Sequence, residues 1–393
     1  MILKRYYSHT IMTHTIMTVY GTRPEAIKVA PVIKALESSS HFESIAVSTG
    51  QHREMLDQVN DLFGIVPHTD LNIFTHGQSP SSIMANILTK LEPLLDETQP
   101  DAVLVQGDTS TSTAAALAAF YRKIPVIHLE AGLRSGNINS PFPEEANRKI
   151  TTQIAKLHLA PTSESRNNLA IENIPPESIS ITGNTVIDAL LTVVERKEVF
   201  DDAELEELRQ SQRPILLVTT HRRENWGATM EGMGRALRRL AEENPGYTIV
   251  LPIHRNPLVR EALLPNLEGL PNVVTTEPLE YGQFAHLLSL SRIILTDSGG
   301  VQEEAPSLGK PVLVMRENTE RPEAVRAGTV KLIGTEEQRI IDEVSQLIND
   351  EQLYEAMAAA VNPYGDGMAS ERTLAAIAQM LNIGERLPDF VAA

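Results

Sequence analysis

The sequence predicts an α/β protein with two Rossmann-like domains around a central cleft. Its 393 residues exceed the length at which a single hydrophobic core stops growing. Short apolar runs alternate with segments of helical periodicity, and the alternation begins again near the middle of the chain. This order is typical of parallel sheets covered by helices on both faces. Ligands are then expected beyond the carboxyl ends of the strands.

The first series of elements predicts an N-terminal domain over residues 1–185. Its strands are expected at the apolar runs Ile16–Tyr20, Ser44–Val47, Ala102–Val105, Val126–Leu129 and His158–Ala160. Its helices are expected at the periodic segments Ala26–Leu36, His52–Phe63, Ser81–Leu95 and Ser112–Tyr121.

The second series predicts a C-terminal domain over residues 186–367. Its expected strands are Ile215–Thr219, Thr248–Leu251, Val273–Thr275, Ile293–Leu295 and Val312–Val314, with helices such as Glu231–Glu243 between them. We place the hinge close to Thr185. The last periodic segment, Ser370–Leu381, predicts a terminal helix, and we expect residues 368–393 to return to the first domain.

Composition narrows the classes of function. The formal net charge of -17 argues against nucleic acid as a partner, because binding to a phosphate backbone needs an excess of Lys and Arg. The sequence has no cysteine, which excludes disulfides and thiolate chemistry, and its histidines lack metal-ligand spacing, so we expect no metal. Without a membrane-spanning run or a continuous apolar leader, we expect an unprocessed, soluble, cytoplasmic protein with no membrane partner.

A phosphate-binding turn is predicted after the strand Ile293–Leu295. Ser298, Gly299 and Gly300 open a helix there, and glycines let an anion approach the free N–H groups of a helix start. About one turn later, Glu303 and Glu304 are placed to accept hydrogen bonds from ribose hydroxyls. The alternative is that Ser-Gly-Gly merely caps a short helix, which Pro306 soon interrupts.

Carboxylates follow two other predicted strands. Asp108 follows Ala102–Val105, and Glu130 follows Val126–Leu129. If these strands are adjacent, about 5 Å apart, the two carboxylates share one edge of the sheet. A further pair, Glu144 and Glu145, follows in the proline-rich loop that begins at Ser140. Such carboxyls can have their pKa values pushed apart and act as acid and base.

Each of these residues has a structural alternative. Asp108 could be the N-cap of the next helix, Glu130 could form a salt bridge with Arg134, and the pair at 144–145 could lie in a solvated loop. The sequence does not decide which carboxylate is the base.

Basic groups also gather at strand ends. Arg23 and Lys28 follow the first strand, where we expect them to contact a phosphate or a catalytic carboxylate. His221, with Arg222 and Arg223, follows the first strand of the second domain and could bind phosphate or transfer protons; the alternative is a helix cap. Arg321 could face a sugar, and His254 could be a simple loop residue.

Seven ordered motifs together resemble one family, the non-hydrolysing UDP-N-acetylglucosamine 2-epimerases. They are GTRPEAIK at Gly21, QGDT at Gln106, HLEAGLR at His128, PFPEEANR at Pro141, HRREN at His221, TDSGGVQEEAPSLG at Thr296 and TERPEA at Thr319. The resemblance implies a glycosyltransferase-B architecture, a homodimer, and interconversion of UDP-N-acetylglucosamine and UDP-N-acetylmannosamine without a cofactor. It implies elimination of UDP to a 2-acetamidoglucal, followed by re-addition, which supplies ManNAc units for surface polysaccharide.

The same resemblance implies roles for individual residues. Asp108, Glu130 and Glu144 would supply acid-base chemistry, together with His221. The substrate would be bound by Arg23, Lys28, His221, Phe284, Ser298, Gly299, Gly300, Glu304 and Arg321. Glu304, rather than Glu303, would bind ribose, and Phe284 would lie near uracil.

The match to the second, allosteric UDP-N-acetylglucosamine site of bacterial members is partial. Gln51, Glu144, Arg222 and His254 fit that pattern. Glu54 stands where a Gln is usual and Gly77 where an Arg is usual. We therefore expect weakened or altered activation.

Three rival functions remain. A hydrolysing relative would release UDP and free N-acetylmannosamine, and a related glycosyltransferase would also consume the UDP-sugar. A non-catalytic UDP-sugar sensor would need no acidic cluster in the opposite domain.

Overall fold

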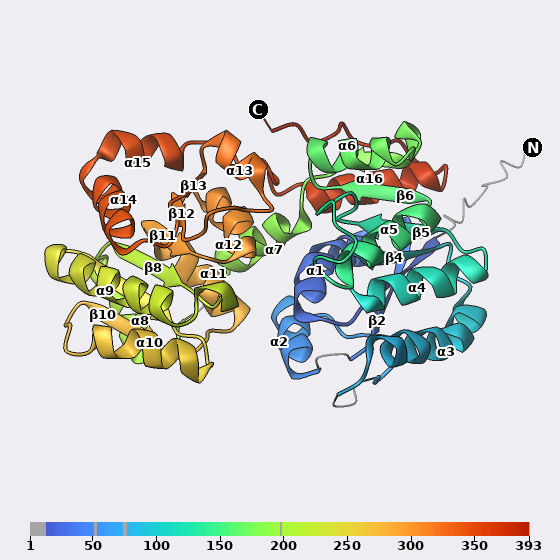
Figure 1. Cartoon of the computed structure of the whole chain (residues 1–393). Helices are drawn as coiled ribbons and strands as arrows, with labels where there is room; N and C mark the ends of the chain where they lie inside the picture. The colour runs from blue at the N-terminus through green and yellow to red at the C-terminus, as the bar shows by residue number, and fades with distance from the viewer. Residues whose placement is uncertain (1–12, 51–52, 74–76, 197–198, 393) are drawn as a thin grey trace, which may run out of the picture. The chain divides into compact units, whose positions relative to one another are not determined.

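The computed structural model describes residues 13–50, 53–73, 77–196 and 199–392. The chain divides into two compact units. The first comprises residues up to Thr185 together with Met368–Phe390, and the second comprises Val186–Gly367 with the last three residues. Figure 1 shows helix α16, coloured red, among the blue and green elements of the first unit. Each unit is an α/β layer structure, which confirms the predicted fold class.

The first unit contains one parallel sheet in the order β3-β2-β1-β4-β5-β6-β7, over the residues described. Its strands are β1 His14–Tyr20, β2 Phe42–Ser48, β3 Thr69–Asp70, β4 Ala102–Gln106, β5 Val126–Leu129, β6 Leu157–Ala160 and β7 Ile179–Ile181. Its helices are α1 Arg23–Ser38, α2 Arg53–Phe63, α3 Pro80–Thr98, α4 Ser110–Tyr121, α5 Glu144–Ile154, α6 Ser163–Ile171, η1 Pro176–Ser178 and α16 Ala369–Met380. Helix α7, Thr185–Glu195, begins at the boundary.

The second unit repeats this design with the order β10-β9-β8-β11-β12-β13 in its described part. Its strands are β8 Ile215–Thr219, β9 Thr248–Pro252, β10 Val273–Thr276, β11 Ile293–Thr296, β12 Val312–Val314 and β13 Val330–Leu332. Its helices are α8 Ala203–Ser211, η2 Arg223–Asn225, α9 Ala228–Glu243, α10 Pro257–Leu267, α11 Tyr281–Leu290, α12 Gly299–Glu304, η3 Ala305–Leu308, α13 Pro322–Ala327, α14 Glu337–Asn349 and α15 Glu351–Ala358.

In both sheets the order in which successive strands are added reverses at an inner pair of strands. In the first unit this switch point lies between β1 and β4, and in the second between β8 and β11. The loops after these strands diverge to opposite faces of the sheet and leave a crevice at its carboxyl edge. Each switch point is therefore where a ligand is expected in its own unit.

Local sequence explains how the first switch point is built. Thr22 caps α1, and Glu25 completes the capping box by accepting hydrogen bonds from the N–H groups of Gly21 at 3.0 Å and Thr22 at 2.7 Å. The hydroxyl of Thr109 donates to the same carboxyl at 2.5 Å. Burial raises the pKa of Glu25. One buried side chain thus joins the loops that follow β1 and β4.

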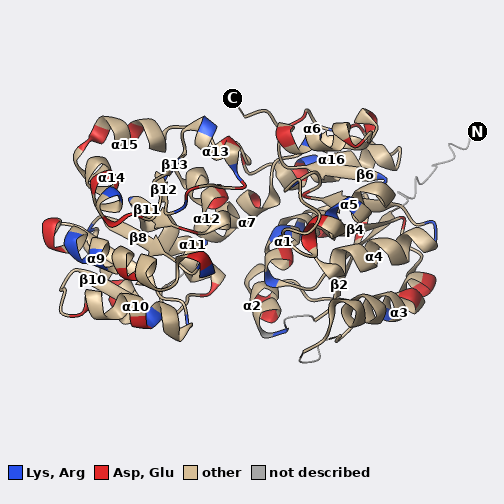
Figure 2. Cartoon of the chain, viewed as in Figure 1, with Lys and Arg blue, Asp and Glu red and all other residues tan. Residues whose placement is uncertain are grey.

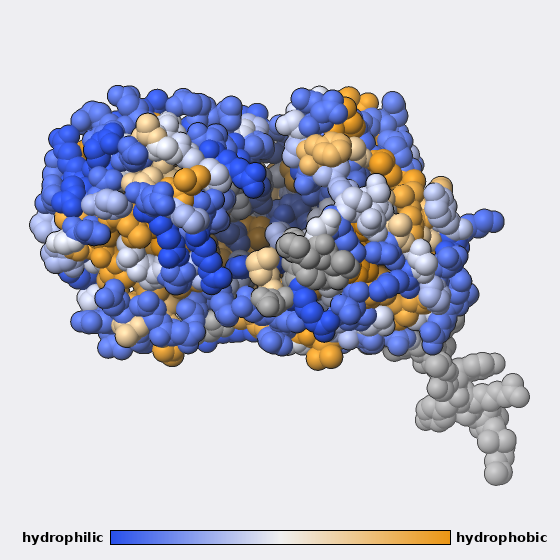
Figure 3. Space-filling view, turned by 60° about the horizontal axis from the view of Figure 1, so that its bottom comes forward, coloured by the Kyte–Doolittle hydropathy of each residue, from blue (hydrophilic) through white to orange (hydrophobic). Residues whose placement is uncertain are grey.

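The outer surface is mainly hydrophilic in the view of Figure 3, with hydrophobic residues in smaller patches. Acidic residues are spread over helices of both units, as on α3 and α15 (Figure 2). Among the described helices, none is long and apolar enough to cross a bilayer.

Candidate functional site

Glu130 occupies the carboxyl end of β5 in the first unit. Its backbone has a left-handed φ of +61°, which turns the chain sharply out of the strand. Its carboxylate accepts hydrogen bonds from the Lys28 ammonium at 2.5 Å, from Asn184 Nδ2 at 3.1 Å, and from Gln106. Lys28 thus contacts a candidate catalytic carboxylate, as predicted. The alternative salt bridge to Arg134 is wrong, because Arg134 pairs with Glu172 at 2.7 Å.

Asp108 lies on the neighbouring strand end, since β4 and β5 pair in parallel with Gln106 opposite Leu129. Thr109, not Asp108, caps α4 by accepting a hydrogen bond from Ser112 N at 3.0 Å, so the capping alternative is wrong. The pKa of Asp108 is raised, mainly by burial and also by Glu130, against the opposing effect of Arg148. The site therefore holds two carboxyl groups in unlike electrostatic settings.

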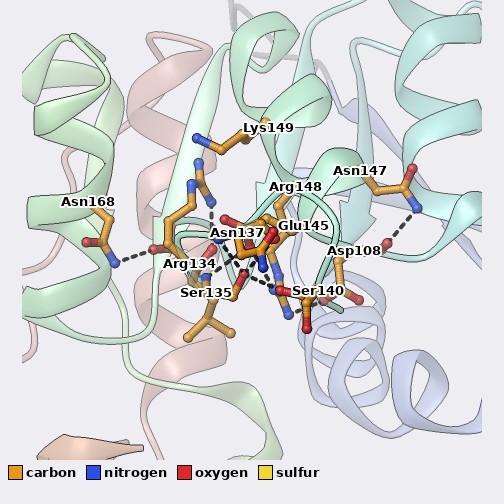
Figure 4. A network of polar contacts seen from close by, with 12 residues as sticks. Asp108, Arg134, Ser135, Asn137, Ser140, Glu145, Asn147, Arg148, Lys149 and Asn168 are labelled. Carbon is orange, nitrogen blue, oxygen red and sulfur yellow. Dashed lines mark hydrogen bonds and ion pairs between the residues drawn. The ribbon is translucent and has the colours of Figure 1, made fainter. Parts of the chain in front are cut away.

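Arg148, which the sequence analysis does not single out, links Asp108 to Glu145. In Figure 4 its guanidinium lies between Asp108 and Glu145, with nitrogen–oxygen distances of 2.5 Å and 3.1 Å. Glu145 is fully buried and also accepts a hydrogen bond from Ser135 N at 3.1 Å. Asn147 Nδ2 donates to the backbone carbonyl of Asp108 at 2.9 Å. The i, i+3 spacing of Glu145 and Arg148 was the available sequence signal.

Glu144 and Glu145 are the first residues of α5, so the solvated-loop interpretation is wrong. Both carboxylates lie in the first turn, where the positive end of the helix dipole favours them. The Oε2 atom of Glu144 is buried and has no hydrogen-bond partner within the described structure. This oxygen is thus a buried acceptor that no described donor satisfies.

His221 occupies the switch point of the second unit, directly after β8. Its ring Nδ1 lies 3.2 Å from Asp297 Oδ1, and its backbone N–H also donates to that carboxylate. Helix η2 begins after Arg222, so the helix-cap alternative for His221 is wrong. The His254 ring stacks on His221 with centroids 6.1 Å apart. Asp297 is a second site residue that sequence reasoning missed, although it follows β11 much as Asp108 follows β4.

The predicted phosphate turn follows β11 in the second unit. Helix α12 begins at Gly299 with Ser298 as its N-cap residue, and the Ser298 hydroxyl makes no capping bond. A Cβ at position 299 would lie 2.6 Å from Arg321 Nη1, whereas one at Gly300 would meet nothing closer than 3.9 Å. Gly299 is therefore required for the close approach of Arg321, and Gly300 leaves open space for a ligand.

The two neighbouring glutamates have different partners. Glu303 Oε1 accepts from Arg321 Nε at 2.6 Å, so this arginine is fixed by the glutamate not assigned to ribose. Glu304 Oε1 accepts from the Tyr281 hydroxyl at 3.1 Å. Tyr281 begins α11, the helix that also carries Phe284. The residues expected near ribose and uracil thus lie on elements joined by a direct hydrogen bond.

Similar known proteins identify the family of this chain. A family model described as UDP-N-acetylglucosamine 2-epimerase matches residues 34–378. The UDP-N-acetylglucosamine 2-epimerase of Salmonella typhimurium is 53% identical over 367 residues, 92% of this chain and 98% of that protein. The chain belongs to the UDP-N-acetylglucosamine 2-epimerase family. It is therefore an enzyme, and the resemblance drawn from its seven motifs is confirmed.

Solved structures agree with this assignment. The UDP-GlcNAc 2-epimerase of Neisseria meningitidis, determined bound to UDP-GlcNAc, superposes with a TM-score of 0.82 at 48% identity. That match covers 93% of this chain and 100% of the other. A glycotransferase of kitacinnamycin, only 14% identical, shares the fold with a TM-score of 0.64 over 94% of this chain and 100% of its own. The predicted glycosyltransferase-B architecture of this epimerase family member is confirmed.

The candidate allosteric residues are divided between the two units. Glu54 belongs to α2, and Glu144 begins α5, both in the first unit. Arg222 and His254 belong to the second unit, on the loops that follow β8 and β9. Gln51 lies outside the described residues. Neither unit alone assembles the set, so allosteric activation of this family member stays a prediction.

Buried histidines beside the site should make the epimerase sensitive to acid. His128 and His158 are paired across β5 and β6, and both are almost fully buried. Burial lowers the pKa of His128 to about 4 and that of His158 to about 3. Because unfolded histidine titrates near pH 6.5, protons bind the unfolded chain first as the pH falls. The folded protein is therefore most stable above about pH 6.5, and its free energy of unfolding decreases as the pH falls toward about 4.

We expect each histidine to account for about 2 kcal/mol of unfolding free energy lost between pH 7 and pH 5. Urea unfolding at the two pH values measures the total. His158→Phe removes one titrating group of similar size, so the variant should lose about 2 kcal/mol less than the unsubstituted protein over this interval. If both proteins show the same pH dependence of the unfolding free energy, His158 is not a cause of the acid sensitivity.

Proposed function

We propose that this enzyme interconverts UDP-N-acetylglucosamine and UDP-N-acetylmannosamine without net hydrolysis. The observation that carries the proposal is the pair of carboxyls at adjacent strand ends of the first switch point. The ammonium of Lys28 stabilises Glu130 as an anion, whereas burial favours the protonated form of Asp108. Two carboxyls in unlike settings can remove a proton from one face of a carbon and return it to the other.

The proposed reaction passes through elimination. The hydrogen at C2 of the sugar is not beside a carbonyl, so its removal must be coupled to loss of a leaving group. A carboxylate takes the C2 proton, a C1–C2 double bond forms, and the C1–O bond breaks with its electron pair going to UDP. The product pair is 2-acetamidoglucal and UDP. Return of a proton to the opposite face of C2 and attack of UDP oxygen at C1 complete the epimerisation.

In this proposal the second unit binds UDP. Ser298, Gly300 and Glu304 hold the nucleotide, with Phe284 near the base. His221 stabilises the negative charge that grows on the departing diphosphate, which is the form of stabilisation with the largest effect in many enzymes. In the first unit Arg23 and Glu144 contact the substrate. The open space at Gly300 supports the role given to this turn.

Proton NMR of UDP-N-acetylglucosamine with the pure protein in deuterium oxide tests the proposal. We expect both UDP-sugars, each with deuterium at C2, and no requirement for nicotinamide. Accumulation of UDP and free N-acetylmannosamine would instead show the hydrolysing reaction. Substrate that stays unchanged and unlabelled would refute epimerisation.

We also propose that the enzyme acts as a cytoplasmic homodimer that supplies ManNAc units for surface polysaccharide. This proposal rests on the motif resemblance. Analytical ultracentrifugation tests the dimer, and loss of ManNAc from the polysaccharide of a deletion strain tests the supply.

A further inference from the structure

We propose that Asp297 is a positioning residue that fixes the tautomer and orientation of the His221 ring. The inference deepens the proposed function, in which His221 faces the departing diphosphate. Asp297 carries no assigned role in the motif that contains it. It follows β11 at the switch point of the second unit, and its side chain is completely buried.

Every hydrogen bond to this carboxylate comes from the segment 220–225, within the described residues. The Thr220 hydroxyl donates at 2.8 Å, the N–H groups of His221 and Arg222 each donate at 3.0 Å, and Asn225 Nδ2 donates at 3.2 Å. Burial alone would raise the pKa of Asp297, but the bonds from His221, Arg222 and Thr220 outweigh it and lower the pKa. Asp297 is therefore a buried anion whose donors all lie on the His221 loop.

The geometry also selects one form of the imidazole ring. Nδ1 of His221 lies 3.2 Å from Asp297 Oδ1, and an anion that already accepts other hydrogen bonds can face this nitrogen only if the nitrogen carries a proton. The proton of the neutral ring is then fixed on Nδ1, which leaves Nε2 at the far edge of the ring. About half of the His221 side chain is exposed, so the ring is not enclosed by the protein.

This arrangement suits the charge that the reaction creates. A carboxylate beside Nδ1–H stabilises the imidazolium, which forms when Nε2 takes a proton from solvent before the reaction. The His254 ring lies beside the His221 ring, with the two centroids 6.1 Å apart. Only in this doubly protonated form does Nε2 carry a hydrogen that it can donate to a diphosphate oxygen as the C1–O bond breaks, and Asp297 favours that form.

If the role of Asp297 were purely structural, its substitution would have different effects. Asp297 could serve only to fasten the 220–225 loop to β11, and Thr220 would then matter for the same reason. Thr220→Val removes one hydrogen bond from the same carboxylate and leaves the ring contact in place. It is the matched control for Asp297→Asn.

The first readout is the ¹⁵N spectrum of His221 in the unsubstituted protein, which distinguishes a proton on Nδ1 from one on Nε2. We expect the Nδ1–H form, and an Nε2–H form would overturn the proposal without any variant. Asp297→Asn should shift the ring toward Nε2–H, while Thr220→Val should not.

Kinetics give the second readout. Asp297→Asn should lower kcat by about 10²-fold or more with KM changed less than about threefold, because the ring then lacks the carboxylate that stabilises its charged form in the transition state. The double variant with His221→Asn should be no slower than His221→Asn alone. Equal losses of kcat in Asp297→Asn and Thr220→Val, with unchanged ring spectra, would establish a structural role and overturn the inference. If the unsubstituted protein fails to epimerise, the proposed function fails, whereas the spectra still test the pair.

Discussion

Asp108→Asn is expected to lower kcat for epimerisation by about 10²- to 10⁴-fold, the usual contribution of a general acid or base. The substitution keeps the shape of the side chain and leaves an oxygen to accept from Arg148, so the fold should be retained. KM should change by less than about threefold, because proton transfer belongs to the transition state. Loss of deuterium incorporation at C2, followed by NMR in deuterium oxide, measures the chemical step directly.

Glu172→Gln is the matched control. Glu172 is another partly buried carboxylate of the first unit. Its pKa is lowered to about 2, mainly by the hydrogen bond from Arg134 and further by Lys149. Losing this charge should reduce stability and leave kcat within about twofold, since no role in the reaction is assigned to it. Comparable losses of kcat in both variants would show that the effect at Asp108 arises from charge balance rather than catalysis.

Gly132→Ala is expected to have the largest effect on stability. Gly132 follows Glu130 by two residues and has φ of +93°, a conformation that L residues rarely adopt. An added Cβ would lie 2.2 Å from the backbone carbonyl oxygen of Ser165 at the start of α6. Backbone atoms cannot move aside as a side chain can. We expect a loss of more than about 4 kcal/mol in unfolding free energy, or failure to fold, by urea titration.

Gly136→Ala separates the two causes. Gly136 lies in the same loop with φ of +77°, but a Cβ there would meet no atom within 4 Å. The substitution there strains only the backbone, so we expect a loss of about 1–2 kcal/mol in unfolding free energy. If the two alanine variants are equally stable, the contact with Ser165 is not the reason for glycine at position 132.

Much of the fold follows from local sequence because buried parallel strands are continuous apolar runs. The strands that were missed, β3, β7 and β13, have two or three residues each, too few to show a period. Helix α5 was missed because it begins after prolines without a side-chain cap. The carboxyl ends of strands could be found, and with them Asp108, Glu130 and His221.

Contacts between residues far apart in the sequence could not be predicted in this way. Arg148 is 40 positions from Asp108 along the chain, and Asp297 is 76 from His221. Only the order of the strands brings each pair together, and that order is a property of the whole sheet. Motifs therefore predict the candidate site residues, whereas the residues that contact them from elsewhere in the chain are found only in the tertiary structure.

The path of the chain has a consequence for biosynthesis. The second unit is an insertion between two segments of the first, and α16 packs on α1 and β6. Beyond that helix, Phe390 N donates to Ile181 O at 2.7 Å, and Ile181 N donates to the Asp389 carboxylate at 3.0 Å. During synthesis from the N-terminus the second unit can complete its core while the first still lacks these contacts. The half made earliest is thus completed last, and until then its candidate acid-base residues lie in a domain with an uncovered edge.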